Sequence, residues 1–527
     1  MPHLDEHLRN RSFERLARYA ICLLALYAVA RAVVAAHARP LWFDEIFTLA
    51  MARQPTVGAI WDALLRGVDS QGFLFDLVQR GVASPHHTEI MFRLPSILGF
   101  ACTMVCVYVF VKHRSGGVYG VISAASLMLT ALFIPNRAVP CAIDARAYSC
   151  TVAFIAIGLV AYQRAAALRW VGALALTLAL AVSFHFYAVF AIVPFAAAEV
   201  IYSLRNSQIR WPPWIAFALG ASPIAIFWPH LAALRSVLAG GFWSKPSLLA
   251  ARDTYGHFLS VSAYWGMAIF IACAAGLMCW GTGLESIGQL IRRSVSASEQ
   301  ASERSKEFLH ERALAFFLIA TPFTVFVVAR ISHGGYFYHY MLYSILGFAV
   351  AAGFILPTLN RRAIVLASIF LLGALAMQES SFWLSPHRWR LQSPTDVVDD
   401  VLTRAGHPDL PVFVATAHDF LQLAYYAPAP LGSRLVFVAD GPSALSYGSF
   451  DTDDVALQLL ARCYPINVTD FRTFGSLHKS FFLYTAVPGE QDWWLRRLAK
   501  EGFTIQFASF EELPSDQDGV VYLVTGP

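Results

Sequence analysis

Charged residues are scarce in this sequence. Of its 527 residues, 14% are Asp, Glu, Lys or Arg, against about 25% in an average soluble protein, and 57% are hydrophobic. A purely globular fold would have too few polar side chains to cover its surface, so a lipid bilayer must solvate part of the chain. The net charge of +4 is also too small to indicate binding of nucleic acid.

Disulfide and metal-binding patterns are missing as well. The eight cysteines lie mostly inside apolar runs, and we interpret all of them as small packing residues. No dense cluster of Asp and His is visible, so we expect no obligate metal, and a divalent metal is the only cofactor left open.

Long apolar runs dominate what is present. A transmembrane helix needs about 20 mostly apolar residues, and eleven apolar runs have about this length. The sequence therefore predicts an α-helical polytopic membrane protein with about 11 transmembrane helices. The runs fall at 19–37, 94–111, 117–134, 148–163, 170–186, 187–204, 212–229, 260–280, 313–330, 338–357 and 363–379.

Basic residues gather in alternate connections between these runs. Because short basic loops favour the cytoplasm, we expect a multi-pass protein of the bacterial inner membrane with a cytoplasmic N-terminus. The first run also resembles a signal peptide with a cleavage site at Ala36-His37-Ala38. That alternative is less favoured, because the residues after it look functional with their membrane anchor attached. The basic residues are Arg9, Arg11, Arg15 and Arg18, then Lys112, Arg114, Arg164, Arg169, Arg205 and Arg210, then those from Arg292 to Arg312, and Arg361 with Arg362.

Two domains are expected. Residues 1–380 form the transmembrane domain, with a long first outer loop at 38–92, and residues 381–527 form a soluble α/β domain in the periplasm or outside the cell. In the second domain, β-rich runs alternate with helical stretches. The strands are predicted at 412–415, 435–439, 481–485, 504–510 and 520–524, and the helices at 417–426, 453–463 and 490–501.

The first outer loop opens with two adjacent carboxylates, Asp44 and Glu45, in Leu41-Trp42-Phe43-Asp44-Glu45. Carboxylates beside the bilayer usually have a bonding partner or a functional role, because desolvation disfavours their charged form. Either they cap the helix that follows, from Ile46 to Arg53, or they take part in catalysis, and both interpretations stay open.

Further polar residues mark other outer span ends. Each alone is explained by anchoring at the membrane interface. Arg31 is different because it lies inside the first run, where it needs a partner such as Asp44, Glu45 or an anionic ligand. The remaining residues are Arg93, Asp144, Arg146, Tyr148, His185, Tyr187, His333, Tyr338, His339 and Tyr340.

In order and spacing, these segments resemble the membrane glycosyltransferases that use polyprenyl-phosphate sugars, the GT-C fold. The group includes protein O-mannosyltransferases and lipid A aminoarabinose transferases. The likeness covers about the first 350 residues, and the C-terminal α/β tail is similar to tails of bacterial members. It rests on Arg31, LWFDEIFTLAMAR at 41–53, FRLPSILG at 92–99, IDARAYS at 143–149 and HFYAVF at 185–190.

The resemblance implies that Asp44 is the catalytic base or positions the acceptor, with help from Glu45. Asp144 is the acidic residue of the second loop, and Arg146 or Arg93 contacts the donor phosphate. Arg31, Tyr148, His185, His339 and Tyr340 complete the expected substrate site. Two motifs depart from the family: Gln71-Gly72-Phe73-Leu74 replaces a His/Lys-Pro-Pro-Leu stretch, and His339-Tyr340 replaces Arg-Tyr, which puts donor-phosphate contacts in doubt.

The expected function is therefore transfer of a sugar from a polyprenyl-phosphate donor to a lipid, glycan or protein acceptor at the outer face. A lipid-linked saccharide transporter or a non-catalytic membrane scaffold is the alternative. Transporters usually carry acidic residues near the middle of the membrane, and Glu199 is the one such residue in this sequence.

Overall fold

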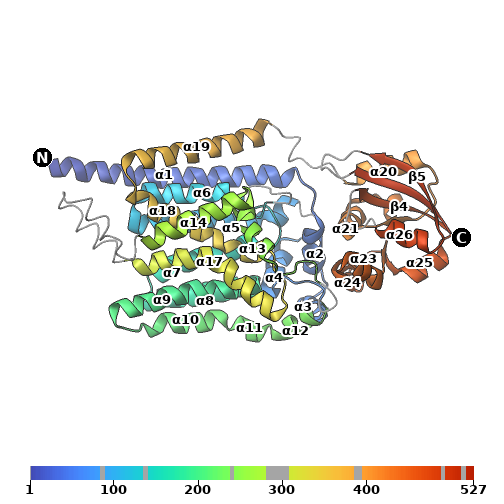
Figure 1. Ribbon diagram of the computed structural model, residues 1–527, viewed down its shortest axis with the longest axis horizontal. Helices are drawn as coiled ribbons and strands as arrows, with labels where there is room; N and C mark the ends of the chain where they lie inside the picture. Colours follow the sequence, from blue (N-terminus) through green and yellow to red (C-terminus); the bar gives the residue numbers. More distant parts are fainter. Residues whose placement is uncertain are drawn as a thin grey trace. The chain divides into compact units, whose positions relative to one another are not determined.

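The computed structural model describes residues 2–83, 89–133, 140–237, 242–279, 308–384, 394–487, 493–511 and 518–526. Their contacts divide the chain into two compact units (Figure 1). The membrane unit comprises residues 1–34, 93–227 and 244–384, and the second unit comprises 35–92, 228–243 and 385–527. Residues 38–92, which were predicted to form the first outer loop, thus group with the C-terminal residues.

The membrane unit is helical throughout its described part, and each of the eleven apolar runs coincides with helical structure. Six described helices are long and apolar enough to cross a membrane, and three shorter apolar helices accompany them. How many of them cross the bilayer stays a prediction. The helices are α1 (Pro2–His37), α5 (Glu89–Ser115), α6 (Gly117–Ser126), η1 (Leu127–Leu129), α7 (Tyr148–Gln163), α8 (Leu168–Phe184), η2 (Phe186–Ala191), α9 (Ile192–Asn206), α10 (Trp211–Ala221), α11 (Pro223–Ile226), α13 (Leu248–Leu259), α14 (Ala263–Cys279), α17 (Leu309–Ser332), η3 (Tyr338–Ser344), α18 (Ile345–Ile355), η4 (Leu356–Thr358) and α19 (Arg361–Leu384).

Helix α18 lies at the centre of the membrane unit, where small residues allow close packing. A Cβ on Gly347 would lie 2.7 Å from the carbonyl oxygen of Ala315 in α17, and one on Gly353 would lie 2.4 Å from a methyl of Val111 in α5. Tight contacts at small residues are typical of helix packing in lipid, where dispersion replaces the hydrophobic effect. In the most apolar stretch of α19, by contrast, no residue is buried, as expected of a helix facing lipid tails.

Four short helices of the second unit come from outside the C-terminal tail. They are α2 (Phe43–Ala52), α3 (Val57–Leu65), α4 (Phe73–Val82) and α12 (Trp228–Val237). The side chain of Thr56 caps α3 by accepting a hydrogen bond from the Ala59 amide. Helix α2 begins at Phe43, three residues before the expected start, so both carboxylates lie in its first turn.

The C-terminal residues form a six-stranded sheet in the order β3-β2-β1-β4-β6-β5. Strands β1 to β4 are parallel, and β6 runs antiparallel to β4 and β5. All five predicted strands are confirmed, and the three predicted helices correspond to α21, α24 and α26, although residues 490–492 of the last lie outside the described residues. The three-residue edge strand β3 has no counterpart among the predictions. The elements are α20 (Pro394–Ala405), β1 (Val412–Val414), α21 (Ala417–Tyr426), α22 (Ala429–Gly432), β2 (Leu435–Ala439), α23 (Gly441–Gly448), α24 (Thr452–Leu460), β3 (Val468–Asp470), α25 (Phe471–Leu477), β4 (Ser480–Val487), α26 (Trp493–Lys500), β5 (Thr504–Glu511) and β6 (Asp518–Thr525).

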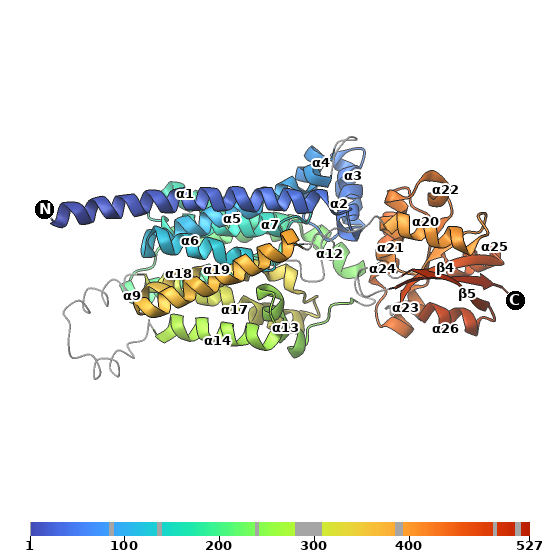
Figure 2. The ribbon, with the colours of Figure 1, turned by 90° about the horizontal axis from the view of Figure 1, so that it is seen from above.

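Helices cover both faces of this sheet, as Figure 2 shows. On one face the Trp494 ring of α26 packs edge-on against Phe413, with ring centroids 4.7 Å apart. On the other face Phe420 of α21 contacts Phe437, at 5.6 Å. Because side chains alternate between the faces along a strand, the nearly continuous apolar runs of β1 and β2 suit a sheet buried on both sides.

Candidate active site

The two carboxylates of the first outer loop have different surroundings. The side chain of Glu45 is fully buried, and its Oε2 accepts a hydrogen bond from the Trp42 amide at 3.2 Å. This bond caps the N-terminus of α2, so the capping interpretation accounts for Glu45. Asp44 is half-buried, and its carbonyl oxygen accepts a bond from the Thr48 hydroxyl at 3.0 Å. Catalysis by Asp44, and assistance by Glu45, stay predictions.

Helix α4 fixes the far end of α2. Arg80 donates hydrogen bonds to the carbonyl oxygens of Ala52, at 3.2 Å, and of Pro55, at 3.0 Å, and also bonds that of Gln54. The face of α4 turned inward carries two more fully buried polar side chains, Asp76 and Gln79. The sequence analysis did not select either of them, although their i, i+3 spacing beside Phe75 could have signalled a polar inward face.

The stretch Gln71-Gly72-Phe73-Leu74 runs from a buried turn into the first turn of α4. Oδ1 of Asp69 accepts bonds from the amides of Ser70, at 2.6 Å, and Gln71, at 3.3 Å. The carbonyl oxygen of Asp69 contacts Nε2 of His230 in α12 at 2.9 Å. Gln71 is itself buried, so this turn is fixed by packing with α12.

In the membrane unit, Asp144 and Arg146 are buried just before α7, and Arg93 is fully buried in α5. The two segments are joined where the Ser96 hydroxyl donates to the carbonyl oxygen of Arg146, at 3.3 Å, and the Ser149 hydroxyl donates to that of Ser96, at 2.8 Å. Arg93 lies one turn before Ser96, so it lies on the same face of α5. The structure therefore brings the FRLPSILG and IDARAYS segments into contact.

Four aromatic or imidazole side chains expected from the sequence meet beside Arg146. Tyr148 lies 5.5 Å from His185 and 5.1 Å from His339 between ring centroids, and His185 lies 5.5 Å from Tyr340. Arg146 is itself buried and lies two residues before Tyr148. These residues come from α7, the end of α8 and η3, so only the tertiary fold assembles them.

Three more residues extend this group. Tyr187 contacts Tyr340 at 4.8 Å and donates to the carbonyl oxygen of Gly335 at 2.6 Å. Tyr338 stacks on His257, with centroids 4.5 Å apart. We call the set Arg146, Tyr148, His185, Tyr187, His257, Tyr338, His339 and Tyr340 the ring cluster. Tyr187 and Tyr338 were predicted from the sequence to be interfacial residues, whereas His257 was not predicted because it lies in no apolar run.

Arg31 pairs with a residue that the sequence analysis did not name. Its Nε lies 2.8 Å from Oε2 of Glu379 in α19, and its guanidinium packs between the rings of Phe133 and Phe382, at 4.3 and 4.0 Å from their centroids. This ion pair links α1 to α19 and explains how an arginine is tolerated within the first run. A role of Arg31 in substrate binding stays a prediction.

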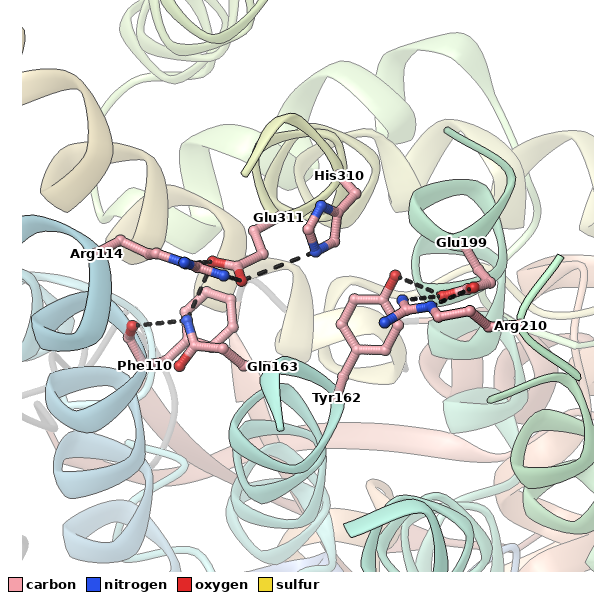
Figure 3. Close-up of polar contacts among 8 residues, drawn as sticks. All are labelled: Phe110, Arg114, Tyr162, Gln163, Glu199, Arg210, His310 and Glu311. Carbon is pink, nitrogen blue, oxygen red and sulfur yellow. Dashed lines mark hydrogen bonds and ion pairs between the residues drawn. The ribbon is translucent and has the colours of Figure 1, made fainter. Parts of the chain in front are cut away.

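A second polar group, shown in Figure 3, lies at the opposite end of α7. Nε and Nη2 of Arg114 donate to the carboxylate of Glu311 at 3.0 and 2.7 Å, and Gln163 also donates to it at 3.0 Å. Arg210 likewise forms two hydrogen bonds to Glu199, at 2.9 and 2.5 Å. We call Arg114, Tyr162, Gln163, Glu199, Arg210, His310 and Glu311 the ion-pair cluster.

No group of three His, Cys, Asp or Glu side chains is arranged to hold a metal ion within the described ranges. The expectation that no metal is obligatory stays a prediction.

The architecture defines a class of protein: an α-helical polytopic membrane protein of the GT-C fold with a C-terminal α/β domain. Comparison with known proteins bears this out in structure and not in sequence. No family model matches the chain, and no curated protein matches it in sequence.

Among solved structures, ArnT from Cupriavidus metallidurans in the apo state is similar at 13% identity and a TM-score of 0.55, over 96% of this chain and 98% of that one. The same protein bound to undecaprenyl phosphate gives 13% identity and a TM-score of 0.55, over 95% and 97%. The oligosaccharyltransferase of Archaeoglobus fulgidus has 10% identity and a TM-score of 0.43. The match to ArnT confirms the expected fold over 96% of the chain.

Proposed function

We propose that this protein is an integral membrane glycosyltransferase that moves a hexosyl or pentosyl group from a polyprenyl-phosphate donor to a lipid, glycan or protein acceptor at the outer face of the membrane. The observation that carries the proposal is the ring cluster, where tyrosine and histidine rings pack together and the buried Arg146 lies two residues before Tyr148, in a chain with the fold of ArnT. The binding of undecaprenyl phosphate to ArnT supports a donor of this class.

The arginines suit the leaving group of this reaction. As the bond between sugar and phosphate breaks, negative charge grows on the phosphate, and a guanidinium can meet two of its oxygens at once. Arg146 and Arg93 take this role in the proposal. Their burial strengthens the attraction, because a site without water screens charges weakly.

Asp44 acts as the base in this mechanism. It takes the proton from the acceptor hydroxyl while the oxygen attacks the anomeric carbon and the polyprenyl phosphate departs. A positioned base typically contributes on the order of 10²- to 10⁴-fold. With one displacement and no enzyme nucleophile, the anomeric configuration inverts.

Substitution of Asp44 tests the proposal. We expect Asp44→Asn to lower sugar transfer by on the order of 10²-fold or more, because the amide cannot take the proton. A deletion strain is complemented with each variant, and its lipids, surface glycans and exported proteins are compared by mass spectrometry. The missing sugar also identifies donor and acceptor. Asp62→Asn, which changes an exposed carboxylate of α3, is the matched control. Wild-type product from membrane-inserted, folded Asp44→Asn protein would refute the assignment.

One residue suggested the transporter alternative, and its contacts support a structural role instead. Glu199 suggested a transport pathway, but its carboxylate is paired with Arg210 and accepts a bond from the Tyr162 hydroxyl at 3.1 Å. A carboxylate held by two partners is explained by its structural role.

A further inference from the structure

One face of α21 contacts the segment that leads into α2. Nε2 of Gln422 donates to the carbonyl oxygen of Leu41 at 2.8 Å, and the amide of Leu41 donates to the Tyr426 hydroxyl at 2.6 Å. The ring of His418 lies 4.4 Å from that of Phe43. The three α21 residues are spaced four apart, so they form one stripe along the helix. The face that carries Phe420 packs on the sheet instead.

These contacts fix the backbone immediately before Asp44. Leu41 is fully buried, and both its amide and its carbonyl oxygen are bound by side chains of α21. The Tyr426 hydroxyl accepts this amide bond and donates to Oε1 of Glu89 at 3.4 Å, so its own orientation is set. Since α2 begins at Phe43, holding Leu41 sets where the helix starts and hence where its first turn points.

The other end of α2 is held by the same domain. Nε2 of Gln54, just after the helix, donates to the carbonyl oxygen of Cys463 at 3.1 Å, beyond α24. Helix α2 is therefore attached at both ends to the C-terminal residues, although more than 350 residues of sequence separate the partners. These contacts at both ends of α2 support an influence of the C-terminal domain on the first loop.

We propose that the C-terminal domain orients the first outer loop, with His418, Gln422 and Tyr426 as positioning residues for the carboxylate of Asp44. This inference rests on the proposed function, in which that carboxylate is the base. A displacement of about 1 Å at a reacting group can cost on the order of 10²-fold in rate. The stripe would therefore act on the rate of transfer and leave donor binding, assigned to the arginines, unchanged.

The test removes the two hydrogen bonds in the full-length protein. Gln422→Met combined with Tyr426→Phe keeps the size of both side chains but leaves the Leu41 backbone groups without these partners. Gln458→Met and Tyr447→Phe, at more exposed positions of the same domain, are the matched controls. The donor probe is the polyprenyl-phosphate sugar fraction extracted from the source strain, added to membranes of the deletion strain that contain each variant.

We expect the double variant to lower the saturating rate, kcat, at least tenfold, while the amount of extract at half-saturation, KM, changes less than threefold. Hydrogen exchange at the Leu41 amide should accelerate. His418→Phe, which keeps a ring against Phe43, should retain more activity than His418→Ala. The unfolding midpoint of the double variant should fall only modestly, for the two buried hydrogen bonds that are lost, and should stay above the assay temperature.

Unchanged kcat in the double variant beside an inactive Asp44→Asn would overturn the positioning role alone. So would a fall in kcat that merely follows a fall in the unfolding midpoint. An active Asp44→Asn would instead overturn the proposed function, and the role of the stripe in catalysis with it. The two failures are therefore distinguishable.

Discussion

The ring cluster and the ion-pair cluster lie at the two ends of α7, separated by about 22 Å along its axis. In the ion-pair cluster, each buried carboxylate is bound twice by the arginine of another helix. In the ring cluster, the contacts described are mainly between tyrosine and histidine rings. Paired charges such as those of the ion-pair cluster hold helices together, whereas the ring cluster belongs to the proposed substrate site.

The difference predicts that one cluster controls folding and the other activity. Removing one partner of a buried ion pair leaves an uncompensated charge, which is costly whatever the protein does. Removing a ligand-binding guanidinium costs transfer and leaves the helix packing in place. Substitutions at both ends of α7 can separate the two effects.

The largest effect is expected at Glu311. Glu311→Gln should lower the free energy of unfolding by about 3–5 kcal/mol, because Arg114 then keeps its charge without the carboxylate. Thermal unfolding and yield of the purified protein in detergent measure it. The double variant Arg114→Met with Glu311→Met is the control and should recover much of the loss. If Glu311→Gln unfolds at the wild-type temperature, the structural role of the cluster is wrong.

At the other end of α7, Arg146→Met should lower kcat/KM by about 10²-fold, the usual cost of losing one donor to a developing negative charge. Its unfolding midpoint should stay near that of the wild type. Arg164→Met, beyond the opposite end of α7, serves as the control and should transfer sugar normally. If Arg146→Met loses as much stability as activity, the ring cluster stabilises the fold, as the ion-pair cluster does.

A smaller effect is expected at Asp454, a buried carboxylate that sharpens the contrast with Glu311. Burial, opposed by a hydrogen bond from the Asp440 amide and reinforced by the charges of Asp440, Asp451 and Asp453, raises the pKa of Asp454 to about 7. The folded state thus keeps a proton that the unfolded state has lost above about pH 4. Between pH 5 and 7, ionisation of this group should therefore lower the stability of the C-terminal domain by about 2 kcal/mol.

Hydrogen exchange of the β2 amides in the full-length protein, followed across this pH range, measures the change. Asp454→Asn, which cannot ionise, should flatten the dependence and slow exchange at pH 8. The same slope in the variant and in the wild type would exclude Asp454 as its source.

Much of the fold could be predicted from local patterns. The apolar runs located the helices of the membrane unit, and the alternation of β-rich and helical segments located five strands and α21. The edge strand β3 escaped because three partly exposed residues carry too weak a pattern. Of the candidate site, the sequence indicated Arg146, Tyr148, His185, His339 and Tyr340 as separate span-end residues, but not His257.

The sequence by itself determined which segments form apolar helices, which segments of the tail form strands, and that Asp44 and Glu45 are the candidate carboxylates. These features depend on the type and spacing of neighbouring residues. Tertiary structure alone decided which polar groups meet. Arg31 pairs with Glu379, Glu45 caps a helix while Asp44 stays half-exposed, and α21 binds Leu41. Arg31 and Glu379, and Leu41 and Gln422, lie hundreds of residues apart, so only packing of the whole chain sets their distance, whereas the Glu45 cap is local and was one of the two interpretations open from the sequence.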